Sequence, residues 1–134
     1  MGFSVGMLRG GDGVVDHRLT RRALINEVKR GRVSKDSVCD AHPELVRAAR
    51  NIGEKTDTMC PICEETEVVL VTYVFGHGLP KHGKCITDRA EVVKLQRTSH
   101  EYAAYVVEAC PSCKWHHLLR VLPIVGRGRS RAAR

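Results

Sequence analysis

The spacing of apolar positions changes near Gly53, from a helical period before it to β-type segments after it. The stretch 14–30, VVDHRLTRRALINEVKR, is compatible with a helix and is followed by Gly31, a residue typical of helix C-termini. Next, Ser34 can cap a short helical turn, and Asp40 can cap a further helix that ends at Gly53. The first part of the chain is therefore expected to hold three helical pieces.

After Gly53 the chain is rich in β-branched and aromatic residues, which favours strands over 67–75, 102–109 and 118–125. Between the first two of these segments, a helix is predicted over about 87–100. Helices followed by strands, rather than strictly alternating with them, indicate an α+β fold.

The composition suggests that this fold needs a covalent or metal staple. The chain has 134 residues, and only 4% of them are aromatic, so the core must be built mainly from aliphatic side chains. A chain of this length buries a modest core. A link between distant segments is therefore expected to contribute much of the stability.

Positive charge is concentrated at the two ends of the sequence. The formal net charge is +7, of which residues 1–53 carry +4, residues 54–125 carry −1 and residues 126–134 carry +4. Arginine outnumbers lysine fifteen to seven, which favours forked contacts with phosphate. The asymmetry is typical of proteins with a polyanionic partner, although a merely solubilising surface is the simpler alternative. One face of the first helix gathers the cations Arg18, Arg21, Arg22 and Lys29.

The strongest chemical signal is a pair of Cys-x-x-Cys motifs, Cys60 to Cys63 and Cys110 to Cys113. Each tight turn presents two sulfurs to one side, and four thiolates satisfy tetrahedral zinc. Strand-like segments adjoin both motifs, so a zinc ribbon with a knuckle at each of two hairpin tips is predicted. The 46 residues between the motifs exceed the usual spacing and imply a helical insertion. One structural zinc ion is the expected cofactor.

Two other uses of these cysteines are less consistent with the sequence. A redox dithiol would need only one motif, within a βαβ unit. His42 and Glu44 followed by Cys60 and Cys63 imitate a zinc deaminase signature, but Met59 stands where that signature has proline. Four cysteines would also close a coordination shell that catalysis needs open.

Several residues near the motifs have two possible roles. Trp115 either stacks on bases, together with contacts from Lys114 and His116, or only covers the metal site. Cys39 is expected to be a buried small residue, and Cys85 an exposed thiol.

Four stretches of the sequence form a recognisable set: Val38-Cys39-Asp40-Ala41-His42-Pro43, Cys60 to Cys63, Val74-Phe75-Gly76, and Cys110 to Cys113 with Trp115 and His117. With these motifs the chain resembles a family of short actinobacterial proteins that form a domain of unknown function. The resemblance covers roughly residues 14–122 and implies a zinc-ribbon-like fold and an actinobacterial cytoplasm, with no reaction attached.

The sequence thus predicts a leader over 1–13, a basic helical segment over 14–53, a zinc-ribbon domain over 54–125 and an arginine-rich tail over 126–134. The leader is expected to be flexible and the tail disordered. No stretch is apolar for the length of a membrane span, and no signal peptide is evident, so a cytoplasmic location is expected.

The expected function is non-catalytic binding to a nucleic-acid machine, with the ribosome or its RNA ahead of RNA polymerase or DNA. A transcription factor, a polymerase-associated zinc ribbon and a protein-binding adaptor are the alternatives, and an enzyme using Cys85 is the least favoured. The residues expected to contact nucleic acid are Arg18, Arg21, Arg22, Lys29, Lys114, Trp115, His116, Arg127, Arg129, Arg131 and Arg134.

Overall fold

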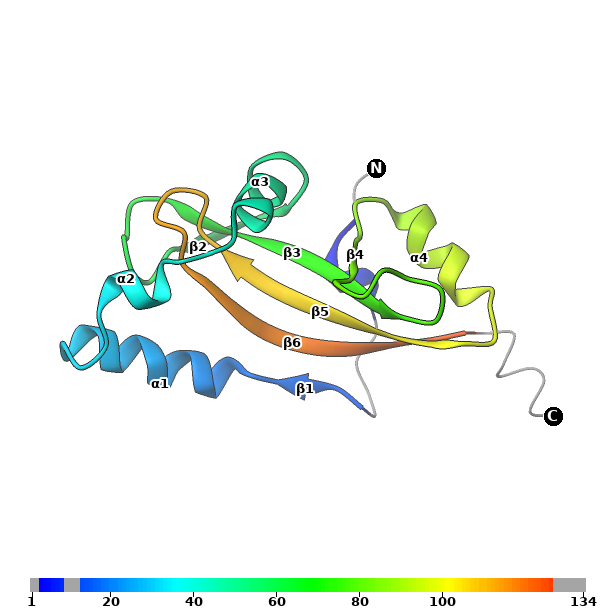
Figure 1. The fold of residues 1–134 in the computed structure, drawn as a ribbon, viewed down its shortest axis with the longest axis horizontal. Helices are drawn as coiled ribbons and strands as arrows, with labels where there is room; N and C mark the ends of the chain where they lie inside the picture. The colour runs from blue at the N-terminus through cyan, green and yellow to red at the C-terminus, as the bar shows by residue number, and fades with distance from the viewer. Residues whose placement is uncertain (1–2, 9–12, 127–134) are drawn as a thin grey trace.

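A computed structural model describes residues 3–8 and 13–126. Its helices and strands confirm the α+β class: within the described residues, four α-helices accompany one antiparallel sheet with the strand order β1-β6-β5-β3-β2, and β4 pairs with β3 (Figure 1). The elements are a 3-10 turn η1 (Val5–Met7), β1 (Val15–Asp16), α1 (Arg18–Lys29), α2 (Lys35–Val38), α3 (Pro43–Asn51), β2 (Glu54–Met59), β3 (Glu67–Gly76), β4 (Lys84–Cys85), α4 (Arg89–Gln96), β5 (Glu101–Ala109) and β6 (His116–Val125).

The register of the two central strands determines which turns meet. β3 and β5 run antiparallel, with Val69 opposite Ala109 and Gly76 opposite Tyr102. The start of β3 therefore lies beside the end of β5. As a result, the turn between β2 and β3 and the turn between β5 and β6 lie at the same end of the sheet, next to α2 and α3 (Figure 1). These are the two turns that carry the Cys-x-x-Cys motifs.

An inserted helix accounts for only part of the long spacing between the motifs. The two long central strands occupy much of the interval, and the connection between them, which contains β4 and α4, lies at the opposite end of the sheet (Figure 1). The helix α4 begins at Arg89, where Asp88 and Glu91 form a capping box, and ends at Gln96, short of the predicted position 100.

Two other predicted boundaries need correction. The helix expected over 14–30 begins only at Arg18, because Val15 pairs with Val121 and Asp16 with Arg120 as strand β1. His42, not Asp40, caps α3, since its side chain accepts a hydrogen bond from the backbone N–H of Glu44. In both cases a partner distant in the sequence decides the local structure: the Asp40 carboxylate instead contacts His116.

The predicted flexible leader is also corrected within residues 3–8. Val5 and Leu8 are buried in the core beneath α4, together with Val74 and Val106 of the sheet. Glu54 holds this segment in place, because its carboxylate accepts hydrogen bonds from the Val5 backbone N–H and the Ser4 hydroxyl. The predicted tail, apart from Gly126, lies outside the described residues.

The sheet and helices bury three clusters of apolar side chains. One lies under η1 and α4, and a second lies between α3 and the odd-numbered residues of β3. The third joins α1 and α2 to the cysteine turns, with Ile25, Val28 and Val38 packed against Cys60, Cys110 and Trp115. The helices α1 and α2 therefore pack as a cap over the cysteine turns of the sheet.

Candidate metal centre

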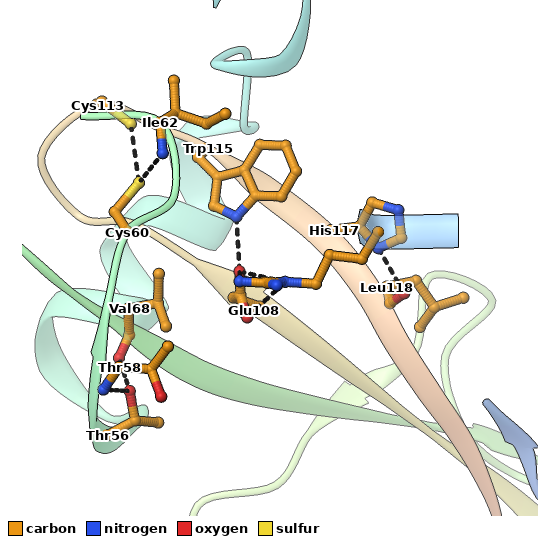
Figure 2. A network of polar contacts seen from close by, with 11 residues as sticks. Thr56, Thr58, Cys60, Ile62, Val68, Glu108, Cys113, Trp115, His117 and Leu118 are labelled. Carbon is orange, nitrogen blue, oxygen red and sulfur yellow. Dashed lines mark hydrogen bonds and ion pairs between the residues drawn. The ribbon is translucent and has the colours of Figure 1, made fainter. Parts of the chain in front are cut away.

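The four cysteines of the two motifs converge on one point. One sulfur atom from each of Cys60, Cys63, Cys110 and Cys113 lies within 4.8 Å of all the others. Cys60 and Cys113 have their sulfurs 3.6 Å apart (Figure 2), and Cys63 and Cys110 have theirs 3.8 Å apart. Tetrahedral zinc with Zn–S bonds of about 2.3 Å would separate its sulfurs by about 3.8 Å. The site therefore fits one metal ion of that size.

The two turns are built alike. Cys60 donates its backbone N–H to Thr66 and accepts the Glu64 N–H at its carbonyl, while Cys110 does the same with Trp115 and Lys114. The residue four positions after the start of the motif has a left-handed backbone in both turns, with φ of 55° at Glu64 and 71° at Lys114. We call these two turns, residues 60–64 and 110–114, the first and the second knuckle.

Backbone donors also point at the first sulfur of each knuckle. The N–H of Ile62 lies 3.4 Å from the Cys60 sulfur (Figure 2), and the N–H of Cys113 lies 3.4 Å from the Cys110 sulfur. Such donors stabilise a negatively charged sulfur. The folded backbone is therefore arranged for thiolate ligands even though the sulfurs lie in an apolar cluster.

The protonation of these sulfurs shows why a cation is needed. Burial raises the pKa of Cys60 above its ordinary range and raises that of Cys113 to about 12. Burial also acts on Cys63, but hydrogen bonds from the Glu65 backbone and from neighbouring cysteines outweigh it, so its pKa is lowered. Without a cation the Cys60 and Cys113 thiols keep their protons at neutral pH. A bound divalent metal would displace those protons and convert the crowded sulfurs into ligands.

Trp115 lies directly behind the metal centre. Its indole is fully buried, and its ring nitrogen donates a hydrogen bond of 2.7 Å to the Glu108 carboxylate (Figure 2). The same carboxylate forms an ion pair with Arg21 of α1. The Arg21 Nε and Nη2 atoms lie 3.0 Å and 2.9 Å from Glu108 Oε2. Of the two roles open to Trp115, the structure supports the covering one. The expectation that its ring stacks on bases is corrected, because no ring face is accessible.

The other residues predicted to contact nucleic acid fall into paired and unpaired groups. Arg21 is held by Glu108, and Arg18 forms a two-pronged ion pair with Asp16 and thereby lowers the pKa of that carboxyl to about 2. Arg22, Lys29 and Lys114 are exposed, and no ion pair joins them to a carboxylate in the part of the chain that the structure describes. His116 contacts Asp40 at 2.9 Å. The four tail arginines, Arg127, Arg129, Arg131 and Arg134, lie outside the described residues.

A shallow groove beside the second knuckle adds cations that the sequence did not indicate. It has a volume of about 390 Å³. Arg47 and Arg50 of α3 join Lys114 at its surface, and Arg47 is also paired with the exposed Glu44 carboxylate at 2.7 Å. None of the lining residues is acidic; they are Ala41, Pro43, Val46, Arg47, Arg50, Asn51 and Lys114. Arg50 also donates a hydrogen bond to the carbonyl of Pro111, which fixes α3 to the knuckle. The helical period of Arg47 and Arg50 was visible in the sequence, but their proximity to Lys114 was not.

The two remaining cysteines differ from expectation. Cys85 is only partly exposed, and burial raises the pKa of its thiol, which disfavours a nucleophilic role. Cys39 does not simply fill space in the core, because its sulfur lies 3.5 Å from that of Cys113. Its position in the Val-Cys-Asp-Ala stretch, away from either motif, gave no sign of this contact.

No helix among the described residues combines the length and the apolar character needed to cross a membrane. No solved structure matches the chain significantly. Two mycobacterial proteins are similar to it: the uncharacterized protein Rv0049 of Mycobacterium tuberculosis (strain H37Rv) and the uncharacterized protein Mb0050 of Mycobacterium bovis. Each is 36% identical over 129 residues, which cover 90% of this chain and 94% of the relative.

A match to one protein family also extends over almost the whole chain. DUF5318, a family of unknown function, matches residues 8–134 of this chain. This span is longer than the span 14–122 that the motifs alone indicated. The span includes both knuckles and the Val-Cys-Asp-Ala stretch that contacts the second of them. The chain therefore belongs to the DUF5318 family.

Proposed function

We propose that this protein is a non-catalytic zinc protein in which one structural ion joins two hairpins and fixes a phosphate-binding surface. The observation that carries the zinc assignment is the convergence of four cysteine sulfurs within 4.8 Å of one another. Four thiolates close the tetrahedral shell, so the ion offers no open position to a substrate. The arrangement would then be a zinc ribbon, with its knuckles at the tips of the β2–β3 and β5–β6 hairpins.

Metal analysis of the purified protein tests this assignment. We expect one zinc ion per chain, bound without colour, whereas iron on four cysteines would absorb visible light. A chelator should remove the ion and expose four additional thiols to a thiol reagent. Protein that holds no metal, or that pairs these cysteines as disulfides under reducing conditions, would contradict the proposal.

The basic groove supports a phosphate-bearing partner. Arg47, Arg50 and Lys114 line one depression, and the zinc knuckle determines where Lys114 lies, because this residue occupies the knuckle's left-handed position. Arginine and lysine side chains around a shallow groove suit the backbone of a nucleic acid. Arg22 and Lys29 on α1 and the four tail arginines would add positive charge.

Among nucleic acids, we favour RNA, and ribosomal RNA in particular. The high share of arginine and the basic tail suit the irregular, closely spaced phosphates of folded RNA, into which a basic segment can insert and become ordered. A strong preference for one duplex sequence would instead favour the transcription alternative. Recovery of RNA polymerase subunits that does not depend on RNA would favour docking on that enzyme.

Lys114→Asn is expected to weaken RNA binding severalfold and to lower the salt-dependence slope of binding by about one. Asparagine removes the charge and tolerates the left-handed backbone, so the knuckle should stay intact. Glu64→Asn is the matched control, because Glu64 occupies the equivalent position of the other knuckle. Fluorescence anisotropy with ribosomal RNA fragments at several salt concentrations measures both effects. Equal affinities of Lys114→Asn and wild type would remove the groove from the interface.

A protein-binding adaptor is a second candidate, favoured by exposed apolar side chains on β1 and at the start of α1. Leu19 of α1 is 83% exposed and Val15 of β1 is 47% exposed. Large aliphatic side chains at such exposure are typical of contact surfaces when they cluster. Crosslinking in cells from a photoreactive residue at position 19 would distinguish this candidate, since an adaptor should give a discrete protein adduct there.

A further inference from the structure

The cysteine cluster has a fifth thiol at its border. The Cys39 sulfur lies 3.5 Å from the Cys113 sulfur, which is as close as the ligand sulfurs lie to one another. Cys39 is nevertheless outside the group whose four sulfurs all lie within 4.8 Å of one another. It therefore contacts one corner of the site without occupying a position in the tetrahedron.

The fold holds Cys39 at that corner. Cys39 is the C-cap of α2, and its backbone N–H donates a hydrogen bond to the carbonyl of Lys35. The two residues that follow are fixed to the second knuckle: Asp40 contacts His116, and the Ala41 N–H donates to the carbonyl of Lys114. The approach of Cys39 to Cys113 is thus imposed by contacts on both sides.

Cys113 is also the more exposed cysteine of its motif. Cys60 and Cys110 are fully buried, whereas Cys113 and Cys39 both retain partial exposure. A ligand that is partly exposed and lies next to another thiol can leave the metal without exposing the buried sulfurs or leaving the ion three-coordinate. No other corner of the site has such a neighbour among the cysteines that the structure describes.

We propose that Cys39 is an alternative zinc ligand that exchanges with Cys113. The inference rests on the proposed zinc site. In the exchange, the bond from the metal to the Cys113 sulfur breaks, a bond from the metal to the Cys39 sulfur forms, and the Cys39 proton passes to the Cys113 sulfur. Charge and coordination number are unchanged, and no oxidant is involved. The site would then keep four sulfur ligands while one partly exposed thiol remains free for reaction.

Thiol mapping on the intact zinc-loaded protein tests the exchange. A maleimide at limiting concentration should label either Cys39 or Cys113, in different molecules, while Cys60 and Cys110 stay protected. In Cys39→Ala, Cys113 should lose its labelling because it then has no substitute. Cys85, which lies outside the cluster, serves as the internal reference in both proteins. Labelling of Cys39 alone in the wild-type protein, with Cys113 as protected as Cys60, would overturn the proposal.

A second measurement uses Cys113→Ser with and without Cys39. Cys113→Ser should keep one metal ion and the cobalt spectrum of a four-sulfur site, whereas Cys113→Ser with Cys39→Ala should lose that spectrum and bind the metal more weakly, because only three cysteine ligands remain. Cys110→Ser should weaken binding whether or not Cys39 is present. If Cys113→Ser and the double variant lose metal affinity equally while the wild-type protein binds zinc, the exchange is rejected and the zinc assignment stands. Wild-type protein without metal would reject both.

Discussion

Cys60→Ser is expected to release the metal ion and to abolish the cooperative unfolding transition of the protein. Cys60 is fully buried and belongs to the knuckle that joins β2 to β3. Structural zinc contributes about 10–16 kcal/mol of apparent binding free energy, and that energy is folding energy. A small domain with few aromatic residues has no reserve of this size. Circular dichroism melting together with metal analysis measures both losses.

The matched control for this substitution is Cys85→Ser, which makes the same chemical change outside the cluster. It should keep one zinc ion and unfold cooperatively. Adding a chelator to the wild-type protein should reproduce the behaviour of Cys60→Ser, and adding zinc back should restore folding. A Cys60→Ser protein with full zinc content and a wild-type melting curve would refute the structural role of the ion.

Arg21→Ala is expected to destabilise the protein by about 3–5 kcal/mol, because it leaves a charged carboxylate buried without its cation. The Glu108 side chain is 5% exposed and the Arg21 side chain 21% exposed, so solvent screens this pair weakly. Among the described residues, the carboxylate would then keep only its hydrogen bond from Trp115. Since Trp115 packs against Cys60 and Cys110, the loss should also loosen the metal centre. Urea denaturation of the zinc-loaded protein gives the change in unfolding free energy.

Arg18→Ala on the same helix provides the comparison. Arg18 pairs with Asp16, but its side chain is 70% exposed, so solvent screens this pair and its loss should lower the unfolding free energy far less than Arg21→Ala does. The two substitutions remove the same side chain type, three residues apart, from an exposed pair and from a buried one. Equal effects would mean that the Arg21–Glu108 pair does not stabilise the fold in the way its burial implies.

Three strands were predictable from the sequence because each has at least one face with buried side chains. The predicted segments 67–75, 102–109 and 118–125 correspond to β3, β5 and β6, which supply most of the buried side chains in two of the three apolar clusters. β2 was missed because its sequence, EKTDTM, lies at the sheet edge with mostly exposed polar side chains. An edge strand needs only backbone pairing, so its side chains carry no alternation to detect.

The metal ligands were predictable for a similar reason. A Cys-x-x-Cys turn brings two sulfurs together locally, so two such motifs indicate a site without knowledge of the fold. Cys39, Arg47 and Arg50 carry no such local signal. They reach the second knuckle only because α2 and α3 pack beside it, and this packing depends on contacts such as Asp40 with His116.

The sequence by itself determined the α+β class, the three long strands and the four cysteines that can hold a metal, because each follows from a local period or spacing. The tertiary structure alone decided the roles of side chains with two possible partners. It buried Trp115 on Glu108, engaged Arg21 in the same contact and placed Cys39 beside Cys113. The physical reason is that these roles depend on which distant segments meet, and the antiparallel register of β3 and β5 fixes that meeting.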